Sequence, residues 1–229
     1  MIDGPMRILL VNDDGIDSER LFYAYRTLKE YGEVMMVTPS SRQSGKSMSI
    51  SLGEVQYHSF SPEYHTVTGT PADCVTVALF SRAFRYKPDL IVSGINKGYN
   101  LGMDTNYSGT VGAALQGLYH GYKSIAFSGD PNGMANIKTL FKQTLDYILD
   151  NDLASLDYVL NVNFPSDDFR LTEAKIVKTK RYIFKSKILT RTVHKNVAIR
   201  REIIEEDYPE GTDMHAHERG RVSISRIWL

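Results

Sequence analysis

The chain has 229 residues, of which 42% are hydrophobic and 24% are charged, the balance of an ordinary globular protein with a core of its own. Lysine plus arginine equals aspartate plus glutamate at 27 each, and this net charge of zero argues against a nucleic-acid polymer or an anionic membrane as partner. The only cysteine, Cys74, excludes an intramolecular disulfide and fits a reducing compartment. No secretory signal pattern and no apolar run near ~20 residues is present, so we expect a cytoplasmic protein.

The chain begins with a strand, a helix and a second strand. Residues 8–11 form a continuous apolar run, which is typical of a strand buried on both faces, and the polar residues 12–15 end it. Apolar residues at helical spacing predict a helix over 18–31, and a second strand is predicted over 34–37. Such a unit should be a right-handed βαβ crossover with parallel strands.

Residues 40–66 are polar and rich in serine, and we expect a loop followed by a hairpin there. The next helix should begin at Thr70, because threonine is a favoured N-cap and Pro71 suits the first helical position. Asp73 then lies near the positive end of the helix dipole. This helix is predicted to continue to Phe84.

The alternation of strands and helices continues as far as residue 164. In chain order we expect a strand over 90–92, a helix over 110–119, a strand over 125–127, a helix over 137–149 and a strand over 158–164. This order predicts an α/β fold, Rossmann-like and doubly wound, with a mostly parallel sheet.

The pattern changes after Pro165. The segments 174–184, 188–205 and 221–227 are charged, poor in helix signals and typical of strands. We therefore divide the chain into an α/β catalytic core, residues 1–170, and a β-rich C-terminal extension or oligomerisation arm, residues 171–229.

Polar clusters follow the first three predicted strands, at Asn12 to Gly15, Ser40 to Gly45 and Ser93 to Asn96. Ligands of open parallel sheets bind at the carboxyl ends of the strands. The neighbouring carboxylates Asp13 and Asp14 would be costly at a buried strand end unless a cation or a proton compensates them. All-oxygen ligands suit Mg²⁺ or Mn²⁺ better than zinc. The alternative is that both carboxylates cap the next helix and stay solvated.

Ser108, Gly109 and Thr110 directly precede a predicted helix, so their backbone N–H groups and hydroxyls can hold a phosphate at its positive end. Ordinary N-capping is the alternative. The chain has no Gly-x-x-x-x-Gly-Lys-Ser/Thr loop, and its first βα turn has no Gly-x-Gly-x-x-Gly fingerprint. These absences argue against an ATPase and against a nicotinamide dehydrogenase.

Together these motifs resemble the stationary-phase survival protein SurE family of metal-dependent 5′/3′-nucleotidases. The matching segments are Asn12-Asp13-Asp14-Gly15-Ile16, Arg42-x-Ser44-Gly45, Thr68 to Cys74, Asp89 to Gly102, Tyr107 to Val111, Asn161 to Pro165, Gly211 to Asp213 and Gly220 to Ser223. The resemblance implies that the metal is held by the paired aspartates, a serine after the second strand and an asparagine after the third. These positions are Asp13, Asp14, Ser44 and Asn96.

The resemblance also implies a phosphate site near Asn96, Ser108, Gly109 and Thr110, and one Mg²⁺ or Mn²⁺ per subunit. It implies a homodimer or homotetramer built partly by exchange of C-terminal segments. The family often has a glycine shortly after Asp-Asp-Gly-Ile, where this chain has Ser18-Glu19-Arg20. That departure bears on substrate preference.

The sequence thus predicts hydrolysis of nucleoside monophosphates to nucleoside and phosphate, with 3′-nucleotidase and exopolyphosphatase activities left open. Asp13 and Asp14 are the catalytic candidates, with Asp14 or metal-activated water as base, or with Asp13 forming an aspartyl phosphate. The alternative is a non-catalytic nucleotide or phosphate sensor, which would keep the helix start but would not need four oxygen ligands.

Four further features have a functional and an ordinary interpretation. We expect Cys74 to pack in the core rather than act as a nucleophile. His215 and His217 are expected to be solvated rather than metal ligands, and the basic stretch 175–195 to be a solvated β surface. Lys97 could offset phosphate charge or be an exposed loop lysine.

Overall fold

The computed structural model describes residues 4–84, 86–193, 196–204 and 207–229. Its strands are β1 (Met6–Val11), β2 (Gly32–Pro39), β3 (Tyr57–Ser61), β4 (Tyr64–Val67), β5 (Leu90–Lys97), β6 (Ser124–Gly129), β7 (Tyr158–Asn163), β8 (Ile176–Thr179), β9 (Ser186–Val193), β10 (Asn196–Ile203) and β11 (Val222–Trp228). Its helices are α1 (Glu19–Leu28), α2 (Pro71–Phe80), the 3₁₀ turn η1 (Gly102–Asn106), α3 (Gly109–Tyr119), α4 (Ala135–Asp150) and α5 (Asp213–Glu218).

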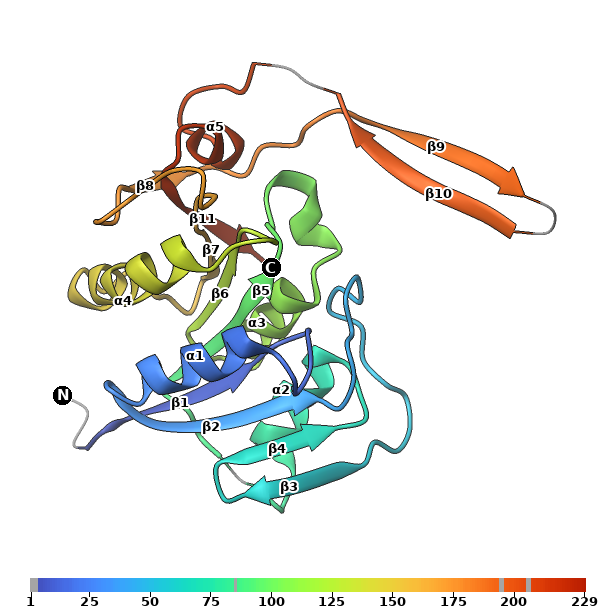
Figure 1. Ribbon diagram of the computed structural model, residues 1–229. Coiled ribbons are helices and arrows are strands. Elements are labelled where there is room, and N and C mark those ends of the chain that lie inside the picture. Colours follow the sequence, from blue (N-terminus) through green and yellow to red (C-terminus); the bar gives the residue numbers. More distant parts are fainter. Residues whose placement is uncertain (1–3, 85, 194–195, 205–206) are drawn as a thin grey trace.

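A nine-stranded, mostly parallel sheet runs through the molecule in the order β3-β4-β2-β1-β5-β6-β7-β11-β8 (Figure 1). Strand β1 pairs in parallel with β2 on one side and with β5 on the other, and β6 and β7 follow β5 in parallel. The strand order therefore reverses between β1 and β5. In doubly wound folds the crevice at the carboxyl ends of two such strands is the usual ligand site.

Helices cover both faces of the sheet, as a strand buried on both sides requires. Side chains of β1 alternate between two cores. Ile8 and Leu10 pack in the core that includes α1 and α4, whereas Leu9 and Val11 pack in the core that includes α2. The predicted α/β architecture is thereby confirmed. Among the described residues, no helix has both the length and the apolar character needed to cross a membrane.

Several predicted boundaries are displaced. The helix expected to reach Phe84 ends at Phe80, although its start is as predicted, with Thr70 and Asp73 forming a capping box. Strand β5 continues to Lys97 instead of ending at residue 92, because pairing with β6 resumes at Asn96 after a register shift. The polar motif after the third predicted strand therefore belongs to the strand itself.

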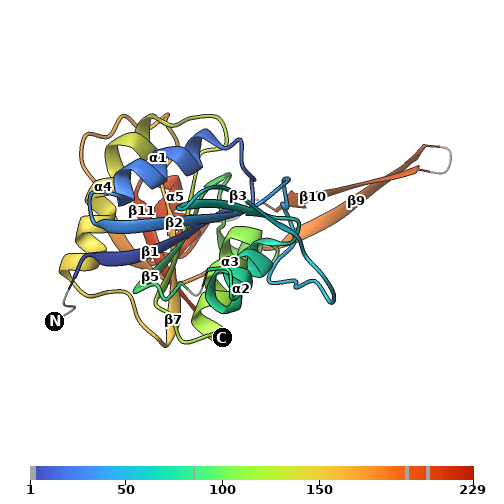
Figure 2. The same ribbon diagram turned by 90° about the horizontal axis from the view of Figure 1, so that it is seen from below.

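The C-terminal region contributes to the sheet and also leaves it. Strand β11 pairs antiparallel with β7 and parallel with β8, and thus extends the central sheet. The antiparallel hairpin of β9 and β10 projects away from the rest of the molecule (Figures 1 and 2). Residues 194–195 and 205 of the predicted segment 188–205 lie outside the described residues. The division at residue 170 stays a prediction.

Candidate active site

The switch point between β1 and β5 brings together residues that lie far apart in the sequence. Asp13 follows β1, Ser44 lies in the loop after β2, Asn96 lies near the end of β5, and Ser108 precedes α3. All four line one cavity of ≈ 530 Å³. Asp14 lines an adjoining cavity of ≈ 460 Å³. The predicted metal and phosphate residues thus meet at one edge of the sheet.

Asp13 is buried against the first turn of α3. Its side chain is 2% exposed, and the Thr110 hydroxyl donates a hydrogen bond to its Oδ1 at 2.6 Å. Gly109 packs closely against it, because a Cβ at this position would lie 3.0 Å from the Asp13 Cβ and would require the neighbouring atoms to shift. Burial raises the pKa of Asp13 to about 6, the Thr110 hydrogen bond opposes this rise, and the charge of Asp14 adds to it.

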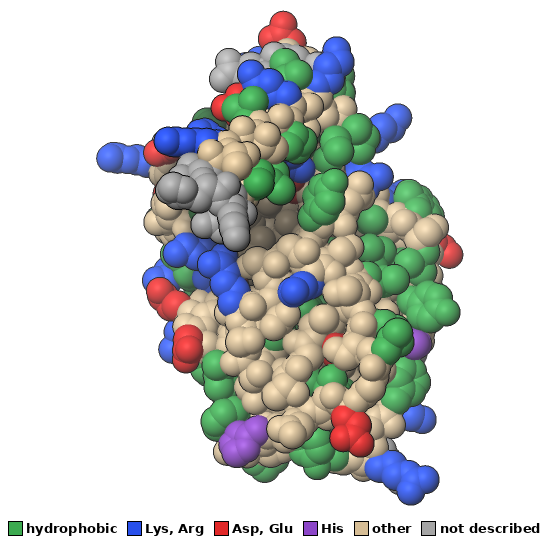
Figure 3. Space-filling model, turned by 90° about the vertical axis from the view of Figure 1, so that its right-hand side faces the viewer, with side chains coloured by type: hydrophobic (Ala, Val, Ile, Leu, Met, Phe, Trp, Pro, Cys, Tyr) green, Lys and Arg blue, Asp and Glu red, His purple; other side chains and the backbone are tan. Residues whose placement is uncertain are grey.

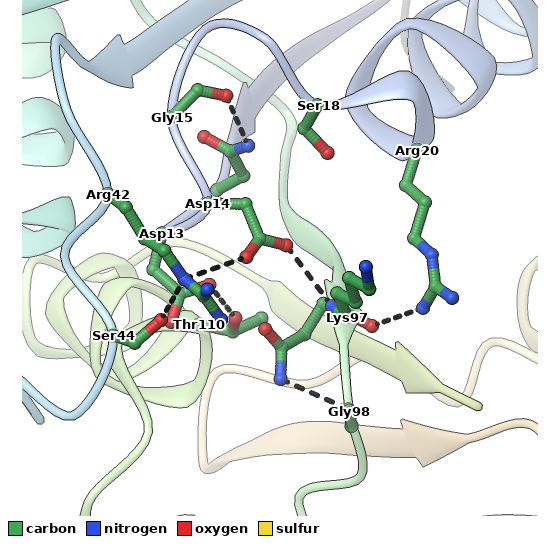
Figure 4. A network of polar contacts seen from close by, with 12 residues as sticks. Asp13, Asp14, Gly15, Ser18, Arg20, Arg42, Ser44, Lys97, Gly98 and Thr110 are labelled. Carbon is green, nitrogen blue, oxygen red and sulfur yellow. Dashed lines mark hydrogen bonds and ion pairs between the residues drawn. The ribbon is translucent and has the colours of Figure 1, made fainter. Parts of the chain in front are cut away.

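Asp14 is held by groups from β5 and from the loop after β2 (Figure 4). The backbone N–H of Lys97 donates to Asp14 Oδ2 at 3.1 Å. Arg42 Nε lies 3.7 Å from Asp14 Oδ1 and donates to Ser44 Oγ at 2.8 Å. The Arg42 guanidinium therefore lies between two of the residues expected to bind a cation, which shows that their oxygens attract positive charge.

Asn96 is fixed on both its backbone and its side chain. Its side-chain Nδ2 donates to Gly98 O at 3.0 Å, which leaves the side-chain oxygen as the acceptor for another group. Its backbone oxygen accepts a hydrogen bond from Arg20 at 2.8 Å. Asn96 is consequently held in place at the edge of the cavity.

The start of α3 combines capping with a possible anion site. Ser108 Oγ accepts a hydrogen bond from Val111 N at 3.1 Å, so Ser108 is the N-cap. The N–H groups of Gly109 and Thr110 belong to the first turn, where the helix offers no carbonyl partners. Because the Thr110 hydroxyl is used by Asp13, Thr110 can reach a phosphate only through its backbone.

The donor set is an oxygen set. In the described ranges, no three His, Cys, Asp or Glu side chains gather into a metal-binding group. A cation at this edge would therefore use the two carboxylates together with the Ser44 hydroxyl and the Asn96 carbonyl. Such ligands fit Mg²⁺ or Mn²⁺ and do not suit zinc.

The other candidates differ in how close they lie to this edge. Cys74 is fully buried in α2, and burial raises the pKa of its thiol well above the ordinary value, so the predicted packing role is confirmed. His217 is less solvated than we expected, because its ring packs 4.2 Å from that of Tyr99 and burial lowers its pKa. Lys97 is exposed and lines both cavities.

Several residues at the site were not predicted to act there. Arg42 lies within a recognised motif and lines both cavities, yet its position in the loop gave no sign of its contacts. Arg201 of β10 reaches the ≈ 530 Å³ cavity, pairs with Asp104 and lies 5.8 Å from the centre of the Tyr107 ring. Nothing near residue 201 signalled this contact, since its partners lie about a hundred positions earlier in the chain.

The basic stretch 175–195 is only partly the solvated surface that we expected. Arg181 donates hydrogen bonds to Thr105 Oγ1 at 3.1 Å and to Asn106 Oδ1 at 2.8 Å. It thus binds the η1 turn that leads into Ser108 and α3.

Comparison with known proteins identifies the family. A sequence profile described as Survival protein SurE matches residues 8–187. A 5′-nucleotidase SurE of Albidiferax ferrireducens is 34% identical, covering 97% of this chain and 91% of the relative, and a 5′/3′-nucleotidase SurE of Wigglesworthia glossinidia brevipalpis is 36% identical with the same coverage. The crystal structure of Sure protein from Aquifex aeolicus superposes with a TM-score of 0.83 at 33% identity, over 97% of this chain and 93% of that one. On the strength of these matches and the shared motifs, the chain belongs to the SurE family.

Proposed function

We propose that this chain is a metal-dependent 5′-nucleotidase that hydrolyses nucleoside monophosphates to nucleoside and phosphate. The observation that carries the proposal is the convergence of Asp13, Ser44, Asn96 and Ser108 on one cavity at the switch point of the sheet. Family membership supports it, because similar relatives are named 5′-nucleotidase SurE. The lone, buried cysteine fits the cytoplasmic location that we propose.

Asp13, Asp14, Ser44 and Asn96 would hold one Mg²⁺ or Mn²⁺. The support is chemical, since the four side chains offer only oxygen donors and two of them carry negative charge. When bound, the cation would supply a Lewis acid that offsets negative charge and lowers the pKa of a coordinated water. Arg42 would then have to leave its contacts with Ser44 and Asp14, which its 65% exposed side chain allows.

The phosphate would lie against the first turn of α3. The N–H groups of Gly109 and Thr110 point from the positive end of that helix, with Ser108 and Asn96 beside them on the cavity. Arg42 and Lys97, which line both cavities, would neutralise charge on the phosphoryl oxygens. A released Arg42 side chain would thus have a second anion to bind.

The two aspartates differ in the roles open to them. One oxygen of Asp13 accepts the Thr110 hydrogen bond and its side chain is almost fully buried, which suits a fixed charge that orients other groups. Asp14 is less buried and lines the adjoining cavity. We therefore propose that it acts as the general base that accepts a proton from the attacking water. Because Asp13 is the less accessible of the two, we also favour direct attack of water on the phosphate over a route in which Asp13 forms an aspartyl phosphate.

A non-catalytic sensor is the alternative function. It would use the start of α3 in the same way, but two neighbouring carboxylates would hinder it, because their negative charge repels a bound phosphate. The buried Asp13, held by Thr110, therefore favours the enzyme. Which phosphate position is hydrolysed, and whether polyphosphate is cleaved, are questions for assays of 5′-monophosphates, 3′-monophosphates and polyphosphate side by side.

We further propose that the chain forms a homodimer or homotetramer through the hairpin of β9 and β10. This hairpin is one part of the predicted C-terminal extension 171–229, and from here on it alone is called the arm. Strand alternation puts Val197, Ile199, Arg201 and Ile203 on one face of β10. Val197 and Ile199 are 56% and 73% exposed, so this face of the hairpin presents neighbouring apolar side chains to solvent. Hydrophobic and basic side chains lie side by side where the arm points at the viewer in Figure 3. A second copy would cover this face.

Substituting Asp14 by asparagine tests the metal and the chemistry together. Wild type should release phosphate from a nucleoside monophosphate with Mn²⁺, and a chelator should abolish the release. Asp14→Asn is nearly isosteric but removes one charge, and losing ~3 kcal/mol of transition-state stabilisation would slow turnover more than ~100-fold. The variant should also need more Mn²⁺. Asp150→Asn, at an exposed position at the end of α4, is the matched control. Turnover of Asp14→Asn at the wild-type rate would show that the carboxylate is structural, and nucleotide binding without phosphate release by wild type would favour the sensor.

Thr110 tests how far the orientation of Asp13 matters. Thr110→Val keeps the β-branched shape but removes the hydroxyl that donates to Asp13, so kcat/KM should fall by roughly 10–100-fold. Thr110→Ser keeps the hydroxyl and should stay within a few-fold of wild type. Melting curves of both variants should lie close to that of wild type. Equal activity of the valine and serine variants would reduce Thr110 to a packing residue.

The buried Asp13 predicts a pH dependence of stability in the metal-free protein. Its folded-state pKa of about 6 lies above the ordinary value of 3.8, so protonation favours the folded state. The stability from this group is fully present below about pH 4 and is lost as the pH rises through 6. The loss is about 3 kcal/mol, since one pKa unit corresponds to about 1.4 kcal/mol. In chelator, Asp13→Asn should lack this loss in denaturant titrations between pH 4 and 7, and parallel curves for both proteins would contradict the prediction.

The arm should set the size of the particle in solution. We expect light scattering to show a dimer or tetramer for wild type, and Ile199→Asp to shift it to smaller species because a charge would be buried in the contact. Leu52→Asp, which alters another highly exposed apolar residue, should leave the particle unchanged. A fully active wild-type monomer at micromolar concentration would refute the assembly.

A further inference from the structure

Arg20 is a buried arginine whose hydrogen bonds, in the part of the chain that the structure describes, go to backbone oxygens (Figure 4). It lies in the first turn of α1 and is 6% exposed. One terminal nitrogen donates to Asn96 O at 2.8 Å and to Gly129 O at 3.5 Å, and the other donates to Gly133 O at 2.7 Å and to Asp130 O.

These oxygens come from three segments that meet at the catalytic edge, namely the end of β5, the end of β6 and the loop 130–133. The pairing of β5 with β6 shifts register between Ser93 and Asn96, just before the carbonyl that Arg20 binds. A planar guanidinium has several donors in fixed directions and can satisfy such spread acceptors, whereas a lysine ammonium cannot reach them in the same way. One side chain therefore joins the segments where the regular ladder is interrupted.

Arg20 also carries charge into the site. Burial lowers the pKa of its guanidinium, while the nearby charges of Asp14, Asp130 and Asp167 raise it. Since an arginine stays protonated in proteins, a permanent cation lies beside the proposed metal ligands. Its charge alone would weaken the binding of a divalent cation, and its hold on Asn96 would strengthen it. The two effects have opposite signs, so they can be separated.

We propose that Arg20 is a positioning residue that holds Asn96 for the divalent cation. Fixing the Asn96 backbone, together with the bond from its Nδ2 to Gly98 O, keeps its side-chain oxygen on the cavity that Asp13 lines. The inference rests on the proposed function, because Asn96 is a metal ligand only within that proposal. It goes beyond that function by assigning a role to a residue that is not among the proposed metal and phosphate residues.

The test is Mn²⁺ binding, measured by electron paramagnetic resonance on metal-free protein without substrate. Arg20→Lys keeps the charge and loses the fork, and Arg20→Met loses both. If geometry dominates, the Kd for Mn²⁺ should rise by about 10-fold or more in both, as when other outer partners of metal ligands are removed. Arg26→Lys and Arg26→Met, at an exposed position of the same helix, should bind Mn²⁺ like wild type. Melting curves in chelator fix a temperature at which every variant is folded.

Chemical rescue separates positioning from general stability. Arg20→Gly opens a space for a free guanidinium ion, and millimolar guanidinium chloride should restore much of the Mn²⁺ affinity that equal sodium chloride does not. Wild-type affinity in Arg20→Lys, tighter binding in Arg20→Met, or no rescue would overturn the inference. A wild-type protein that binds no Mn²⁺ would overturn the proposed function as well, whereas Mn²⁺ binding that is equal in wild type and the Arg20 variants would overturn the inference alone.

Discussion

Two neighbouring carboxylates at the end of a buried strand are the constraint around which the catalytic edge is built. Asp13 and Asp14 repel each other, and burial alone would favour the protonated form of Asp13. Each surrounding segment supplies compensation, through the Thr110 hydroxyl, the Lys97 backbone N–H and the Arg42 guanidinium. These contacts offset only part of the negative charge of the two carboxylates. The proposed divalent cation would compensate this remaining charge.

Topology explains why this compensation is available at one place. The carboxyl ends of β1 and β5 adjoin where the strand order reverses, so the turns that follow them open into the same crevice. The start of α3 reaches this crevice because Gly109 has no side chain to hold it away from Asp13. The positive end of a helix and the paired acids are therefore neighbours, so the proposed phosphate and cation sites would adjoin each other.

The sequence predicted best what is decided over short distances along the chain. The helix start at Thr70 follows from residues within one helical turn, and the structure confirms it. Ser108 is an N-cap, as the ordinary alternative for that motif had it. The extent of β5 was missed because pairing with β6 overrides the small polar residues of its second half. Arg20 was missed as a bridge because its acceptors lie 76 to 113 positions further along the chain. No local pattern records such a contact.

The same face of the arm lines the cavity and exposes apolar side chains to solvent. Arg201 enters the cavity from the face of β10 that also carries the exposed Val197 and Ile199, and its register partner Ile188 lines the same cavity. A partner subunit that covered this face of β10 would lie close to Tyr107, which lines the cavity beside Arg201. If the proposed assembly and function both hold, a substitution on this face of the arm would affect turnover and subunit contact at the same time. The adjoining cavity of ≈ 460 Å³, which Asp14, Asp17 and Asn132 help to line, has no residue of the arm in its lining, so substrate contacts made there could change without altering the arm.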